Sequence, residues 1–183
     1  IPVPTAPSFV ALEAATGKLV WESNLPGDKI LHGTWSNPAY GVAKGRPQVV
    51  FPGGDGWVYS FEPKTGKLLW KFNLIPQPGE FGADTWKNGS KVGTPGVGKN
   101  DAWAPYSADP ELGLVYIPVG MPLMDEYGGH RPGDNLFGNS LVALDARTGK
   151  RLWHYQLVHH GLWDHDLPQA PQLLTPPNDC RNA

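Results

Sequence analysis

The chain has 183 residues, with 15 Lys and Arg against 17 Asp and Glu and a formal net charge of −2. This near-neutral balance argues against binding of nucleic acid or of an anionic membrane by bulk charge, and no apolar run reaches the length of a membrane span. Glycine, proline and tryptophan are abundant, at 23, 20 and 8 residues, between strongly patterned segments. That combination predicts an all-β chain that is rich in turns.

One phrase of the sequence occurs three times. The copies are residues 11–21 (ALEAATGKLVW), 60–70 (SFEPKTGKLLW) and 143–153 (ALDARTGKRLW). Each copy starts with a small residue, has a carboxylate two positions later, continues with Thr-Gly-Lys and ends in Trp. A repeated unit of this size indicates a repeat architecture.

Each copy predicts a β-hairpin. Apolar residues alternate with small or acidic ones before the turn, which is the period of a strand with two distinct faces. A glycine stands where a short loop needs a positive φ, at Gly17, Gly66 and Gly149. A carboxylate can accept hydrogen bonds from the loop N–H groups, at Glu13, Glu62 and Asp145. The ring that ends each copy is expected to be buried against a neighbouring unit, at Trp21, Trp70 and Trp153.

The spacing of the copies predicts the blades of a β-propeller. The glycines lie 49 residues apart (66 − 17) and then 83 apart (149 − 66), and the first interval suits one four-stranded blade of about 40–50 residues. Within the second interval only 103–108 and 114–119 read as further strands; residues 75–101 and 121–139 read as long loops. We expect one partial domain over 1–183, with the end of a blade at about 9–31, a blade at 32–74, a blade with long loops at about 102–157 and the start of another at 158–175.

A propeller closes with at least four blades, and this chain supplies roughly three. We therefore expect further blades, either from a longer polypeptide or from other copies of the chain, because unpaired sheet edges invite pairing.

Two stretches contain residues that could bind a ligand or take part in catalysis. Asp164 and Asp166 lie two apart in a segment rich in His and Trp, where both could reach one Ca²⁺ or Mg²⁺. By pattern alone, loop capping is the favoured role for them, since the spacing matches no zinc motif. Trp103 borders a loop and could be a stacking platform for a flat ligand, although packing between blades is the commoner fate of a Trp. A third stretch, 127–135, reads as tight turns around Arg131.

The segments WAPYSADPELGLVY (103–116), GGHRPGDNLF (128–137), the third repeat and VHHGLWDHD (158–166) occur in an order that resembles the pyrroloquinoline quinone (PQQ)-dependent dehydrogenases. The resemblance covers about residues 77–175, and the three repeats resemble the tryptophan-docking hairpins of that family. It implies part of an eight-bladed, all-β propeller of four-stranded antiparallel blades. It also implies a periplasmic or otherwise extracytoplasmic protein with PQQ and Ca²⁺, or another hard cation, as cofactors.

The same resemblance implies roles for three residues. Trp103 matches the residue whose indole lies under the PQQ ring, and Asp164 matches the base that takes the proton of the substrate hydroxyl. Asp166 matches a second acid, so that Asp164 and Asp166 are the expected cation ligands. The implied reaction is oxidation of a small-molecule alcohol or sugar hydroxyl by hydride transfer to the quinone, with an electron acceptor that the sequence does not identify.

Two departures from the family pattern keep an alternative open. Met121 stands where many members have a metal-binding Asn, and a thioether does not serve a hard cation. The acidic ligand and the cofactor-clamping residues of earlier blades have no match in the chain. The site is therefore expected to be incomplete within these residues, and a non-catalytic propeller that serves as a protein-binding scaffold is the alternative.

Overall fold

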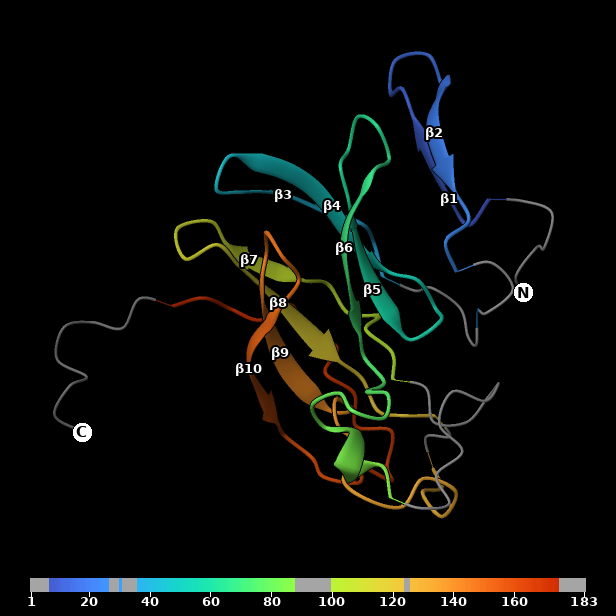
Figure 1. The fold of residues 1–183 in the computed structure, drawn as a ribbon, viewed down its shortest axis with the longest axis vertical. Helices are drawn as coiled ribbons and strands as arrows, with labels where there is room; N and C mark the ends of the chain where they lie inside the picture. The colour runs from blue at the N-terminus through green and yellow to red at the C-terminus, as the bar shows by residue number, and fades with distance from the viewer. Residues whose placement is uncertain (1–6, 27–29, 31–35, 88–99, 124–125, 175–183) are drawn as a thin grey trace, which may run out of the picture.

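A computed structural model describes residues 7–26, 30, 36–87, 100–123 and 126–174. It confirms the all-β prediction: the chain forms a two-stranded hairpin followed by two four-stranded antiparallel sheets (Figure 1). The predicted boundary between residues 31 and 32 and the predicted end of the last segment at 175 lie outside the described residues. Among the described residues no helix is long and apolar enough to cross a membrane.

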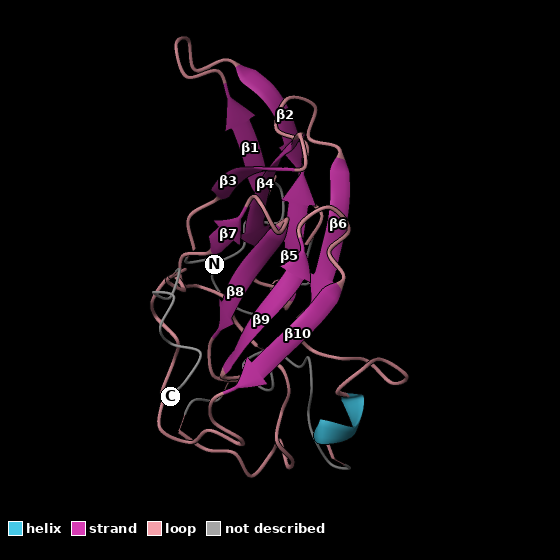
Figure 2. Cartoon of the chain, turned by 90° about the vertical axis from the view of Figure 1, so that its left-hand side faces the viewer, coloured by secondary structure: helices cyan, strands magenta, loops and turns pink. Residues whose placement is uncertain are grey.

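The strands of each sheet follow one another in the sequence. The hairpin consists of β1 (Phe9–Leu12) and β2 (Leu19–Ser23). The first sheet has the order β3 (Ala39–Ala43), β4 (Arg46–Pro52), β5 (Trp57–Phe61) and β6 (Leu68–Asn73). The second has the order β7 (Ser107–Asp109), β8 (Leu114–Val119), β9 (Ser140–Asp145) and β10 (Arg151–Gln156). Figure 2 shows the successive sheets as stacked units, which is the arrangement of consecutive blades.

The three repeats form equivalent hairpins, as the sequence predicts. They join β1 to β2, β5 to β6 and β9 to β10, and each pair shifts register beside the turn. The turn glycines adopt nearly the same φ, 70° at Gly17, 69° at Gly66 and 71° at Gly149. Asp145 Oδ1 accepts from the backbone N–H of Arg147 at 2.9 Å and of Thr148 at 2.8 Å. The carboxylate thus orders the turn from within.

Each of the first two repeat tryptophans packs under the glycine turn of the next unit. The Trp70 indole N–H donates to Ala146 O at 2.8 Å, and a Cβ added at Gly149 would lie 2.7 Å from the Trp70 ring. The Trp21 indole makes the same contact, donating to Pro63 O at 2.7 Å beneath Gly66. Glycine is required at both turns because the ring occupies the space of a side chain.

The exposure of Trp153 shows that the prediction of burial for all three rings is wrong at this position. Its side chain is 41% exposed, whereas Trp70 is 6% exposed and Trp21 is partly buried. Trp153 contacts Tyr116 of its own sheet, with ring centroids 5.9 Å apart. The physical reason is that no strand follows β10 in the described part of the chain to supply the covering turn.

Two apolar cores lie between the units. The smaller contains Phe51, Tyr59 and Phe61 of the first sheet, against which Phe9 and Trp21 of the hairpin pack. The larger joins the two sheets around the fully buried Val58, Leu74, Ile117, Val142 and Leu144. Burial of this kind contributes about 25 cal/mol for each Å² of apolar surface, so the contacts between sheets hold the units together.

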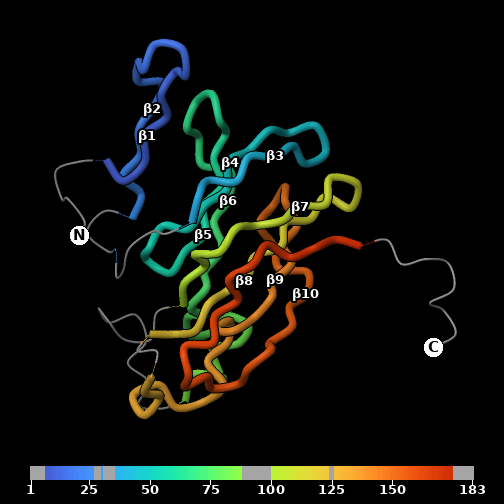
Figure 3. Tube along the Cα trace, turned by 180° about the vertical axis from the view of Figure 1, so that it is seen from behind, coloured from blue at the N-terminus to red at the C-terminus, as the bar shows by residue number. Residues whose placement is uncertain are grey.

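Two details near the candidate site differ from expectation. The strand expected at 103–108 is confined to β7, so that Trp103 precedes it. Asp164, which lies in the segment expected to begin a further blade, is not on a strand, because residues 157–174 form only turns, bends and irregular coil. Figure 3 shows this segment returning beside β7 and β8, and the Ser107 hydroxyl donates to Pro171 O there. That 158–175 begins a further blade stays a prediction.

Candidate functional site

The structure brings Trp103 and the Trp-Asp-His-Asp segment together at the end of β8. The Trp103 indole N–H donates to Asp166 Oδ2 at 2.7 Å, and the backbone N–H of Met121 donates to Asp166 Oδ1 at 2.5 Å. Trp103 and Asp166 are both partly buried. The family resemblance implies one site for Trp103, Asp164 and Asp166, and the fold places Trp103 and Asp166 in direct contact although 63 residues separate them.

Asp164 lies two residues before Asp166 on the same segment. Its side chain is exposed and its backbone has φ 52°, in the left-handed region that Asn and Asp tolerate better than most residues. Asp166 thus faces Trp103, while Asp164 is accessible to solvent. The expected role of Asp164 as a base stays a prediction.

The long β8–β9 connection supports this segment from beneath. Arg131 is fully buried and donates from Nη2 to Gly161 O at 2.6 Å and from Nη1 to Asn135 Oδ1 at 2.9 Å. Asn139 Nδ2 donates to His165 O at 2.6 Å. Sequence reasoning assigns Arg131 to a turn and does not select Asn139. The only sequence feature that could have selected these two residues is that they are polar residues in a Gly- and Pro-rich loop. Their burial depends on the fold.

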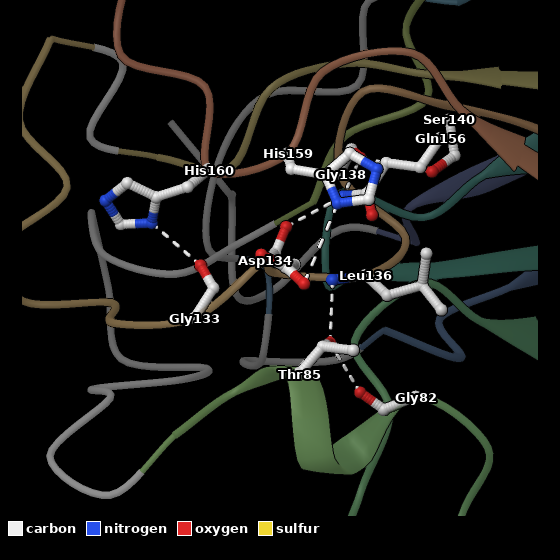
Figure 4. A network of polar contacts seen from close by, with 10 residues as sticks. All are labelled: Gly82, Thr85, Gly133, Asp134, Leu136, Gly138, Ser140, Gln156, His159 and His160. Carbon is white, nitrogen blue, oxygen red and sulfur yellow. Dashed lines mark hydrogen bonds and ion pairs between the residues drawn. The ribbon is translucent and has the colours of Figure 1, made fainter.

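The adjacent histidines contact the same connection. Figure 4 shows His159 next to Asp134, with Nδ1 3.7 Å from Oδ2, and the His160 ring beside Gly133 O at 2.8 Å. The side chains of His159 and Asp134 are 63% and 58% exposed, so solvent screens the pair and it contributes little to stability. These histidines dock one loop on another.

The described residues do not make a complete metal site. No three His, Cys, Asp or Glu side chains among them are grouped so that they could hold an ion. The Met121 side chain is 2% exposed and packs against Gly161, where an added Cβ would lie 3.0 Å from the Met121 sulfur. A hard cation needs six or more oxygens, so Asp164 and Asp166 could supply only part of its shell.

The titration of two further groups reflects their surroundings. Burial, with the nearby Asp101 carboxylate, raises the pKa of Tyr106 well above its usual value, and its hydroxyl donates to Ala102 O at 3.1 Å. Burial, with the cationic Arg151, lowers the pKa of His154. Tyr106 therefore stays neutral at physiological pH and supports the backbone just before Trp103.

Comparison with known proteins places this architecture in a family. The family model described as "PQQ: Glucose/ethanol/alcohol dehydrogenase, beta-propeller domain" matches residues 42–183. A quinoprotein glucose dehydrogenase of Escherichia coli (strain K12) is 40% identical over 119 residues, which are 64% of this chain and 14% of that protein. The quinohemoprotein alcohol dehydrogenase ADH-IIG of Pseudomonas putida is 33% identical over 184 residues, 92% of this chain and 25% of that protein.

Solved structures agree with the sequence relatives. The quinohemoprotein alcohol dehydrogenase ADHIIG of Pseudomonas putida HK5 has a TM-score of 0.71 at 30% identity, over 87% of this chain and 25% of its own. That of Comamonas testosteroni has a TM-score of 0.68 at 29% identity, over 88% and 26%. The chain thus spans a quarter or less of the length of these curated relatives. Because the family model covers most of its residues, the chain belongs to the PQQ-type glucose, ethanol and alcohol dehydrogenase family and forms part of the β-propeller domain.

Proposed function

We propose that these residues are a segment of a PQQ-dependent dehydrogenase that oxidises an alcohol or sugar hydroxyl. The observation that supports this most is the hydrogen bond between the Trp103 indole and Asp166, at 2.7 Å. It joins the proposed aromatic platform to the segment that carries the proposed base. The family membership makes a redox enzyme the stronger interpretation, and we propose an extracytoplasmic location on the same ground.

The residues present fit PQQ in one respect and a cation only in part. Trp103 offers a large flat ring, held at its N–H edge, against which a planar tricyclic group could stack. Asp164 and Asp166 could supply carboxylate oxygens to Ca²⁺ or another hard cation, but the remaining ligands would have to come from other residues. PQQ, when bound, supplies the acceptor for the hydride of the oxidised carbon.

In this proposal the chain performs three tasks. The Trp103 ring would offer a flat face to PQQ, and the exposed Asp164 carboxylate would take the proton from the substrate O–H. With PQQ bound, the substrate would give its hydroxyl proton to Asp164 and its hydride to the quinone, and would leave as a carbonyl compound. The β8–β9 connection holds the base in place through Arg131 and Asn139.

The test uses the complete polypeptide that contains these residues, loaded with PQQ and Ca²⁺. Dye-linked oxidation is measured with a panel of primary alcohols, polyols and aldoses. We expect turnover with at least one of these classes. We expect Asp164→Asn to lower kcat by about 10²–10⁴-fold, the typical contribution of a positioned general base, with PQQ still bound.

Asp134→Asn is the matched control, because Asp134 is another exposed carboxylate, which lies beside His159 of the same loop cluster. It should leave kcat within about twofold of the parent. Full activity in Asp164→Asn would refute the role of the base. Complete absence of PQQ binding together with specific capture of a protein partner would favour the scaffold alternative.

A further inference from the structure

Asp166 uses both oxygens of its carboxylate to join distant parts of the chain. Oδ2 accepts from the Trp103 indole at 2.7 Å and Oδ1 from the Met121 backbone N–H at 2.5 Å. Hydrogen bonds to a charged acceptor are stronger than neutral ones. The carboxylate therefore fixes the edge of the Trp103 ring relative to the end of β8.

Gly120 allows this close approach. A Cβ added at Gly120 would lie 2.7 Å from Asp166 Oδ1 and 3.4 Å from the Trp103 indole nitrogen. The Gly120 N–H donates to Asp101 O at 2.7 Å, which ties the backbone before Trp103 to the end of the same strand. The absence of a side chain at Gly120 lets the carboxylate, the indole and the strand end meet.

The segment that carries Asp166 is itself anchored by buried groups. Arg131 binds Gly161 O and Asn139 binds His165 O, both at 2.6 Å, and both side chains are at most 1% exposed. Burying a guanidinium is costly unless it is hydrogen-bonded, so the Arg131 contacts persist only while the loop keeps this shape. These two hydrogen bonds tie the segment that carries Asp166 to the β8–β9 connection.

We propose that Asp166 is a positioning residue that sets the orientation of the Trp103 ring. The proposal rests on the function proposed above, in which Trp103 is the cofactor platform. An oxygen of a carboxylate has about two acceptor positions, so each Asp166 oxygen keeps one for a cation. Asp166 can therefore hold the Trp103 indole and bind a cation at the same time.

The decisive measurement needs no cofactor. In the complete polypeptide that contains these residues, labelled with ¹⁵N-tryptophan, the loss of one indole N–H resonance in Trp103→Phe assigns the Trp103 signal. We expect Asp166→Ala to shift that resonance and to speed its exchange with solvent at least about tenfold, as loss of a protecting hydrogen bond requires. Asp166→Asn, which keeps one acceptor oxygen, should have a smaller effect.

Two controls separate ring positioning from general damage. Asp164→Asn changes a neighbouring exposed carboxylate and should leave the Trp103 resonance unchanged. The Trp70 indole N–H, bonded to Ala146 O, should be unaffected in every variant. An unshifted Trp103 signal in both Asp166 variants would overturn the proposal, as would equal shifts of Trp103 and Trp70.

A second readout tests the consequence in the PQQ-loaded complete polypeptide. Asp166→Asn should weaken PQQ binding at least about fivefold while the cation concentration is saturating. If the Trp103 resonance responds to Asp166 but PQQ binds to neither protein, the positioning role stands and the proposed function fails. If PQQ binding is unchanged in Asp166→Asn, the link between ring orientation and cofactor binding is refuted.

Discussion

Equivalent positions of the repeat have opposite environments at the joint between the two sheets and on the outer sides of the described units. At the joint, the Trp70 ring lies under Gly149 and its indole binds Ala146 O. On the outer sides, at the β1–β2 turn and on β10, the space is open. A Cβ added at Gly17 would have no atom within 4 Å among the described residues, and Trp153 is 41% exposed. The repeat therefore supplies both halves of a contact, and only a neighbouring unit of the same kind completes it.

The difference indicates how a short repeated sequence can join successive units of a propeller. A turn ordered by its own carboxylate presents a flat backbone surface, and a glycine there admits an indole from the preceding unit. We propose that these contacts are the tryptophan docking of the family that the sequence resembles, and that further blades cover Trp153 and Gly17 in the complete propeller.

The largest expected effect comes from removing the ring at the joint. Trp70→Ala should lower the free energy of unfolding of the chain by about 3–5 kcal/mol, as for other buried Trp truncations. Trp153→Ala, at the equivalent but exposed position, should cost about 1 kcal/mol or less. Urea unfolding followed by circular dichroism measures both. Equal losses would contradict the difference between the filled and the open position.

A smaller effect is expected from adding a methyl group to the turn. Gly149→Ala and Gly17→Ala both place a side chain at φ near 70°, which costs about 1–2 kcal/mol. Only at Gly149 does the new carbon meet a ring, the Trp70 indole at 2.7 Å, which should add about 1–3 kcal/mol. The same unfolding experiment compares the pair. Identical values would show that the indole is free to move aside.

A still smaller effect is expected in the response of the Asp145 turn to acid. Burial acts to raise the Asp145 pKa, but the hydrogen bonds from Thr148 and from the Arg147 backbone outweigh it, so the pKa is lowered. The carboxylate thus stabilises the folded state above its unfolded pKa, and this contribution disappears as the pH falls through the folded pKa.

Asp145→Asn isolates that contribution. At pH 7 it should reduce stability by roughly 0.5 kcal/mol, because solvent screens a partly exposed carboxylate, and the difference from the parent should vanish in strong acid. Unfolding curves between pH 7 and pH 2 give the comparison. A difference that grows toward low pH would have the wrong sign for a lowered pKa.

His154 offers a further check on a different part of the second sheet. Its pKa is lowered by burial and by Arg151, and its ring contacts Phe81 and Phe137, each at 5.5 Å between centroids. The unfolded chain therefore binds a proton at a higher pH than the folded chain, so stability should fall slightly as the pH drops below about 6.5. His154→Gln should remove this slope, which thermal unfolding at pH 7.5 and pH 5.5 can measure.

The fold is predictable from the sequence wherever a local pattern repeats. Thr-Gly-Lys with a carboxylate before it and a Trp after it specifies the turn through short-range hydrogen bonds and a positive φ, so the three hairpins lie at their predicted residues. The strand expected at 114–119 from its apolar run matches β8. The prediction for Trp153 is wrong because burial at its position depends on another unit, which no local pattern supplies.

The candidate site depends on the tertiary structure. The sequence selects Trp103, Asp164 and Asp166, but Asp166 meets the indole because the 157–166 segment folds back across the sheet, a contact over 63 residues. Arg131 and Asn139 have the pattern of ordinary loop residues, and only the packing of two loops buries them and gives them carbonyl partners. Local hydrogen bonds and steric limits act over a few residues and leave their mark on the sequence; the burial of a polar side chain is decided by segments far along the chain.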